Sequence, residues 1–164
     1  MATNAYALDD KGQKVVWSGA VTDVHTTQKE VIGSTRFHGM NVYRYHKFDN
    51  GADSVAAVSG NIAIFKNAAQ DIVTSDFSDL AGSTHAVVAG MFVSVPADGQ
   101  FCWLQVRGPA TLNLAINGSA VDGIGLQAHT TDGMATIAVS GQLFPSFATA
   151  SDASAKVVWL HCVG

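Results

Sequence analysis

The chain has 164 residues, of which 48% are hydrophobic and only 13% are charged, and its formal net charge is −4. Its nine Lys and Arg residues are scattered, which argues against the basic face that binding to nucleic-acid phosphates requires. No apolar run approaches the roughly 18 residues of a membrane span, and no secretion signal opens the chain. We therefore expect neither a nucleic-acid nor a membrane partner.

The low content of charged residues also bears on how the surface is covered. An average globular chain has about 25% charged residues, roughly twice the share found here. The buried centres of protein interfaces are depleted of charge, so the composition favours a surface that is partly hidden in an assembly. The alternative is a compact monomer covered by Ser, Thr, Asn and Gly. In either case the length fits one domain with a sizeable core.

Residues 1–32 show no clear pattern. Asp9 to Gly12 form a turn signal, and residues 14–18 are compatible with a short strand or with an arm that lies on a neighbouring subunit. We expect an extended N-terminal arm here, in which Tyr6 and Trp17 anchor to a neighbour.

The first clearly patterned stretch is Gly33 to Phe48. Bulky and polar residues alternate strictly from Met40 to Phe48, which predicts a β-strand with an amphipathic aromatic face. The turn sequence Asp49-Asn50-Gly51 ends it, because Asn and Gly accept positive φ. Two short apolar runs follow at residues 54–58 and 61–65. A polar loop is expected at residues 71–83, which is compatible with a short strand around Ile72 and Val73.

The middle of the chain predicts a hairpin. Val87 to Val95 is a long apolar strand with a bend or bulge at Gly90, and residues 96–99 turn it into a second strand, Phe101 to Gly108. Bulky residues fall on both faces of this second strand, so it belongs in the middle of a packed sheet. Pro109 closes it off, because proline cannot donate to a strand ladder.

Closely spaced turn signals and short strands continue to the C-terminal end. We expect strands at 111–116 and 134–139, a small, polar and flexible stretch at 142–154, and a last strand at 156–163 that must dock for a barrel to close. Helical periodicity is nearly absent. The sequence thus predicts an all-β fold, a single compact β-barrel or β-sandwich spanning 33–164, with the extended arm at 1–32.

Sequence signatures of catalysis are missing. The chain has no phosphate-binding glycine loop, no nucleophile elbow and no pair of histidines at metal-ligand spacing, and Glu30 is its only glutamate. Most aspartates lie in turns, where they support the backbone. We therefore expect no enzyme activity, no cofactor and no metal. Cys102 and Cys162 are expected to be buried thiols, with a disulfide left open because sequence does not fix their geometry.

Aromatic residues and arginines on the predicted strands are the candidate contact residues. Tyr43, Tyr45 and Trp103 fit a core or subunit-interface aromatic face better than a sugar-binding platform. Arg44 and Arg107 are the strand-borne arginines, suited to ion pairs between subunits or with the carboxylates of a partner.

Two stretches carry a resemblance to a known family. Residues 39–45, with Tyr43-Arg44-Tyr45 at their end, resemble a strand of small tailed-phage virion proteins. Residues 96–108 are similar to the hairpin of those proteins, and the order of the segments up to the closing strand at Cys162 also fits. The resemblance covers roughly residues 33 to 164 and points to the capsid decoration, or cement, proteins of tailed bacteriophages.

This resemblance implies a function. Such proteins are all-β, often homotrimeric, and sit on the outer surface of the capsid where capsomers meet. It therefore implies a structural virion protein, made in the host cytoplasm, that binds the major capsid protein and its own copies and stabilises contacts between capsomers. The alternative is a carbohydrate-binding module or a head- or tail-fibre domain that uses an exposed aromatic platform.

Overall fold

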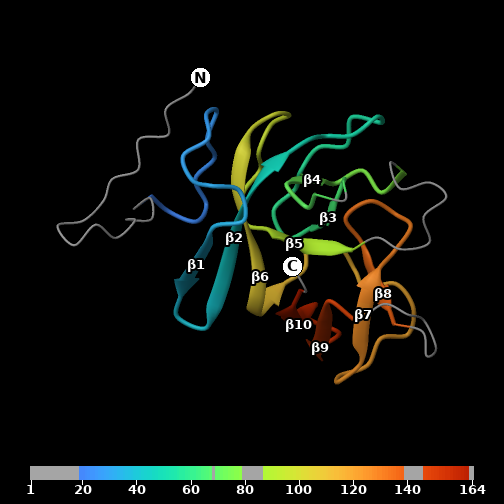
Figure 1. Ribbon diagram of the computed structural model, residues 1–164. Coiled ribbons are helices and arrows are strands. Elements are labelled where there is room, and N and C mark those ends of the chain that lie inside the picture. Colours follow the sequence, from blue (N-terminus) through green and yellow to red (C-terminus); the bar gives the residue numbers. More distant parts are fainter. Residues whose placement is uncertain (1–18, 68, 79–86, 139–145, 163–164) are drawn as a thin grey trace.

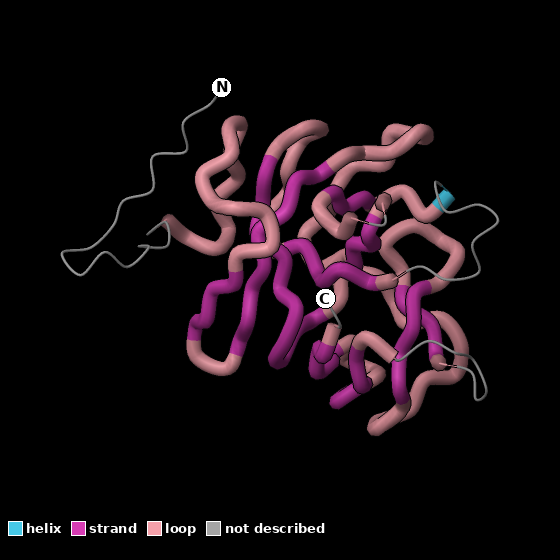
Figure 2. Tube along the Cα trace, in the orientation of Figure 1, coloured by secondary structure: helices cyan, strands magenta, loops and turns pink. Residues whose placement is uncertain are grey.

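The computed structural model describes residues 19–67, 69–78, 87–138 and 146–162, and these residues form ten β-strands (Figure 1). This confirms the predicted all-β class. The short helical piece in Figure 2 is a single turn residue, Ser78. Tyr6 and Trp17, and with them the predicted arm contacts, lie outside the described residues. The strands are β1 (Thr35–His38), β2 (Asn41–Phe48), β3 (Ile62–Phe65), β4 (Ile72–Thr74), β5 (Val88–Phe92), β6 (Phe101–Thr111), β7 (Gly125–Ala128), β8 (Ala135–Ile137), β9 (Ala148–Asp152) and β10 (Val157–His161).

Five of these strands close into a barrel. The ring runs β2-β4-β3-β5-β6 and returns to β2, with β2 and β4 parallel and the other pairs antiparallel. Closure is made by β2 and β6, with Tyr45 opposite Trp103 and His46 opposite Cys102. The prediction that the last strand closes the barrel is therefore wrong. β10 lies outside the ring, because β6 already has β2 and β5 on its two sides there.

The β6 strand is longer than predicted and belongs to two structures. Its first part lies in the barrel, and its last part pairs with β10 in a side sheet of order β6-β10-β9-β7-β8. Pro109 does not end the strand. Leu112 N–H donates to Lys156 and Cys162 N–H to Val106, so the even-numbered residues carry the bonds to β10. The nitrogen of Pro109 consequently points away from β10, and no ladder bond is lost.

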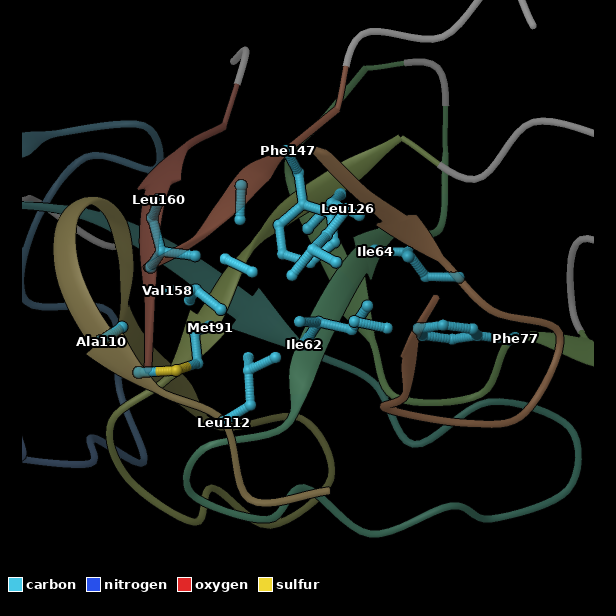
Figure 3. Packing of buried hydrophobic residues seen from close by; sticks show 14 residues of the cluster. Ile62, Ile64, Phe77, Met91, Ala110, Leu112, Leu126, Phe147, Val158 and Leu160 are labelled. Atoms are coloured by element: carbon cyan, nitrogen blue, oxygen red, sulfur yellow. The ribbon is translucent and has the colours of Figure 1, made fainter. Parts of the chain in front are cut away.

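The hydrophobic side chains form three clusters on the two sides of the barrel wall. The barrel interior is filled from all five strands of the ring, with Phe48, Phe92 and Leu104 among its fully buried residues. Outside β3 and β5, a larger cluster packs beneath the side sheet (Figure 3). The third cluster, Tyr43, Tyr45 and Trp103, lies outside β2 and β6. The strands of the barrel are therefore buried on both faces, as their continuous apolar runs require.

Residues 19–32 cover the third cluster. His25 exchanges two backbone hydrogen bonds of 2.9 Å with Phe101, at the start of β6. Val21 and Phe101 pack against Tyr43, Tyr45 and Trp103. This part of the predicted N-terminal segment is thus held on the barrel by paired backbone and apolar contacts.

The predicted hairpin is confirmed, with β5 and β6 paired through Met91 opposite Gln105. The bend predicted at Gly90 is also present, because the register of β3 and β5 shifts beside it. Two other predictions are wrong. Residues 112–116 form no strand, since Asn113 N–H turns to bond Gly60 instead of continuing a ladder. The stretch expected to be flexible contains β9, in which Ala148 and Ala150 are buried against the side-sheet core.

Candidate functional site

A groove of about 200 Å³ opens at the end of the barrel where β1 and β2 turn. It lies on the face shared by the first two strands and the middle of β6, where Val42 stands opposite both Phe37 and Arg107. Figure 1 shows the β1–β2 turn at one end of the barrel. The side chains that line it come from Thr35, Phe37, Val42, Arg44, Val106, Arg107 and Cys162.

Two arginines give this groove its charge. Arg107 is exposed and Arg44 is half-buried. Neither guanidinium group forms an ion pair or hydrogen bond within the described part of the chain, whereas Lys66 is paired with Asp49 at 2.7 Å. The planar guanidinium fork suits bidentate pairing with a carboxylate. The groove therefore has two cationic donors available to an acidic group from outside.

Large apolar side chains stand beside the arginines. Phe37 is 74% exposed and Met40 is 67% exposed, the two highest values among the large hydrophobic residues that the structure describes. Folding leaves this apolar surface in water. Aromatic residues, Met and Arg are the residue types enriched in protein interfaces. The tip of the β1–β2 hairpin and the groove, which we call the hairpin surface, thus have the composition of a contact site.

Gly108 fixes the position of this hairpin. It has φ +100°, and a Cβ atom there would lie 2.7 Å from the Met40 carbonyl oxygen and against the Asn41 side chain. Only glycine allows the backbone of β6 to come so close to the turn between β1 and β2. The hairpin surface is therefore built on a close approach between two backbone segments.

Two residues after Arg44 on β2 lies the fully buried ring of His46, packed edge-on against Phe65 with ring centroids 5.5 Å apart. Burial, helped by the positive charge of Arg44, lowers the pKa of His46 to about 4. Its ring nitrogens lack a well-aligned hydrogen-bond partner among the described residues, although the Asp71 backbone is near enough to oppose the shift. At neutral pH the imidazole is uncharged, and the charge of the groove comes from its arginines.

Tyr43, Tyr45 and Trp103 were expected either in the core or in a subunit interface, and they lie in the core. Tyr45 and Trp103 are fully buried with ring centroids 5.1 Å apart, and Tyr43 is 5% exposed. They lie on the outer face of β2 and β6, and they are buried because residues 19–32 cover that face. These three side chains form no exposed platform for a sugar.

The structure thus brings together only part of the predicted set. Arg44 and Arg107 meet in the groove, while Tyr43, Tyr45 and Trp103 lie in the core. Sequence analysis missed Phe37 and Met40. Their signal was the placement of two large apolar residues around the turn at Gly39, where a tight hairpin leaves little room for burial.

The cysteines, histidines and Ser146 are the other reactive groups of interest. Within the described residues no three His, Cys, Asp or Glu side chains gather as a metal site. Cys102 and Cys162 are free thiols, and burial raises the pKa of each to about 12. Ser146 Oγ lies 3.2 Å from Nε2 of His161, but no carboxylate of the described chain orients that imidazole. A serine nucleophile needs such an oriented base.

The comparisons with known proteins add no relative. No protein-family model, curated protein or solved structure matches the chain. In the part of the chain that the structure describes, there is no helix long and apolar enough to cross a membrane.

Proposed function

We propose that the chain is a structural virion protein of the capsid decoration kind, which binds the major capsid protein on the outer surface of a phage shell and stabilises contacts between capsomers. The observation that carries the proposal is the hairpin surface: Phe37 and Met40 exposed beside the unpaired Arg44 and Arg107. A surface with interface composition on a rigid β-barrel suits a protein that works by contact.

The architecture supports the same function. The barrel is packed on both faces of its wall, so it holds its surface rigid and loses little conformational freedom on binding. Many identical copies on a symmetric shell gain avidity, because contacts after the first are effectively intramolecular. The resemblance of residues 33–164 to decoration proteins and the homotrimer that it implies belong to this proposal. Buried Tyr43, Tyr45 and Trp103 give no support to the carbohydrate-binding alternative.

The test begins with purified virions of the phage whose genome encodes the chain. Mass spectrometry should find the protein in them, and recombinant protein should sediment with expanded shells that lack it and raise their disruption temperature. The double variant Phe37→Ser/Arg107→Glu should lose co-sedimentation, whereas Val121→Ser, at another strongly exposed apolar position, should keep it. Absence from purified virions would refute the proposal.

A further inference from the structure

An acidic loop lies at the other end of the barrel from the hairpin surface. Residues 49–58 form this loop directly after β2. Asp49 is paired with Lys66, but Asp53 is exposed, and within the described part of the chain its carboxylate accepts one hydrogen bond, of 2.9 Å from Ser78 Oγ. Ala52, Ala56 and Val58 around it are also exposed. The loop thus presents one accessible carboxylate among small apolar side chains.

This acidic loop is held in a fixed shape. Asp53 N–H donates to the buried Asp76 carboxylate at 2.8 Å, and Val55 N–H donates to the Asn50 carbonyl at 2.8 Å. Gly51 packs so closely that a Cβ atom there would lie 2.7 Å from Asp76 Cγ. A loop that is already ordered loses little entropy when it docks.

The hairpin surface and the acidic loop cannot meet within one copy. Val42, opposite Arg107, begins the strand β2, and Asp49 follows its last residue. Seven residues of extended chain at about 3.3 Å each separate the two positions by about 23 Å. Figure 1 shows the β1–β2 turn and the loop after β2 at opposite ends of the barrel. The complementary charges are therefore available only between copies.

We propose that the groove of one copy binds the acidic loop of a second copy, with Asp53 paired to Arg107 and Arg44. The exposed Ala52, Ala56 and Val58 then cover Phe37 and Met40. This inference rests on the hairpin surface being a contact surface, as in the proposed function, and identifies its occupant. The argument for a second copy is charge complementarity: the chain carries both halves of the contact, each rigid and each accessible.

The contact is head-to-tail, because two different surfaces meet. Such a heterologous contact closes a ring where the rotation between copies allows it, and otherwise continues into a filament. A ring of three would be the homotrimer that the resemblance implies. Each ring would use every groove and every loop once, so the hairpin surface would act in capsid binding by assembling the ring, whose copies then bind the shell together.

Light scattering coupled to size exclusion tests this contact. The wild-type protein should have a mass of at least twice the 17.1 kDa of one chain. Self-association should weaken in about 1 M salt, where the Debye length is ~3 Å. Arg107→Asp and Asp53→Arg should each weaken self-association by about tenfold or more, because like charges then face each other. The double variant Arg107→Asp/Asp53→Arg exchanges the charges and should regain association.

Mixing gives a second readout. The two single variants, each dissociated alone, should associate with each other, since the groove of either variant then meets a loop of opposite charge on the other; a ring of three would keep one contact between like variants, so the mixed species should be pairs or open chains. Thr130→Asp, on an exposed loop of the side sheet, is the control and should keep the wild-type mass. Circular dichroism and thermal melting show whether each variant is folded.

A monomeric wild-type protein would overturn the inference, as would assembly that is unchanged by both single substitutions or not restored by the double variant. These outcomes are separate from those of the proposed function. If the protein is found in purified virions but is a monomer, only the contact between copies is refuted. If it forms a charge-dependent oligomer but is absent from virions, only the virion role is refuted.

Discussion

The Tyr45 hydroxyl lies 2.9 Å from Nδ1 of His25 and also accepts a hydrogen bond of 3.2 Å from the Lys29 backbone. The side chain that makes both contacts starts from the barrel wall and is fully buried. Tyr45 thereby fastens two points of the segment 19–32 onto the outer face of β2. Burial also raises the pKa of the Tyr45 phenol above its usual value of 10, so the hydroxyl keeps its proton at neutral pH.

Tyr45→Phe should lower the free energy of unfolding by about 1–2 kcal/mol, because the ring stays while its buried hydrogen bonds are lost. Amide hydrogen exchange should rise at residues 25–30. Tyr43→Phe is the matched control: its hydroxyl accepts only a long 3.3 Å bond from Asn41, so the change should be smaller. Equal effects of the two substitutions in urea denaturation would contradict the fastening role.

Trp103→Ala should cost about 3–5 kcal/mol of stability, because it empties a fully buried site between Tyr43, Tyr45 and the covering segment. Trp159→Ala removes the same side chain from a position that is 38% exposed and should cost about 1 kcal/mol. Chemical denaturation of both variants measures the difference. A Trp159 effect as large as that of Trp103 would contradict the placement of the third cluster.

Gly108→Ala should destabilise the protein by about 2 kcal/mol or more, since the new Cβ meets the backbone of the β1–β2 turn. Gly99→Ala is the matched control. Gly99 also has positive φ, +75°, but no atom lies within 4 Å of its Cβ position, so backbone strain of about 1 kcal/mol should be its whole cost. Similar melting temperatures for the two variants would refute the close approach.

Stability should fall with acid in a way that depends on His46. Its pKa is lowered from 6.5 to about 4 in the folded protein, so between these pH values the unfolded chain binds a proton that the folded chain does not. The free energy of unfolding should therefore decrease from pH 6.5 to pH 4, by up to about 3 kcal/mol from this residue. His25, whose pKa is also lowered by burial, acts in the same direction.

The variant His46→Phe should flatten this part of the pH profile, measured by urea denaturation at a series of pH values. His38→Gln changes an exposed histidine on β1 and should leave the profile as it is. If His46→Phe loses as much stability below pH 6.5 as the wild-type protein, groups other than His46 cause the loss and the prediction is wrong.

Much of the barrel could be predicted from sequence because its strands carry strong patterns. Phe101 to Gly108 and Met40 to Phe48 are strands that close the ring. The side sheet was harder to predict. β9 consists of small and polar residues, and its burial comes from fitting Ala148 and Ala150 under larger neighbours, which leaves no apolar run to detect. Pro109 was read as a stop because sequence does not show which edge of a strand faces a partner.

The candidate site shows a similar division. Arg44 and Arg107 could be chosen because they lie on predicted strands, and they do share one groove. That they are the strand-borne arginines is wrong, because Arg36 lies on β1, where it donates to the Gly19 carbonyl oxygen. Tyr43 and Tyr45 were expected in the core or in a subunit interface, and they lie in the core. The cover comes from residues 19–32, whose polar sequence gives no sign that they pack on the barrel. Which face of a two-sided strand reaches the surface is decided by such distant segments.

The closure of the ring by β2 and β6 also sets an order of events on the ribosome. β2 is complete at Phe48, but the strand that pairs along it begins only at Phe101. Until that stretch has left the exit tunnel, β2 has one open edge, since β1 and β4 pair only along the other, and such an edge is prone to mispairing. The β10 partner of β6 emerges later still. Contacts so far apart in sequence close slowly, so the barrel is expected to close only after β6 has emerged, and the side sheet only after β10.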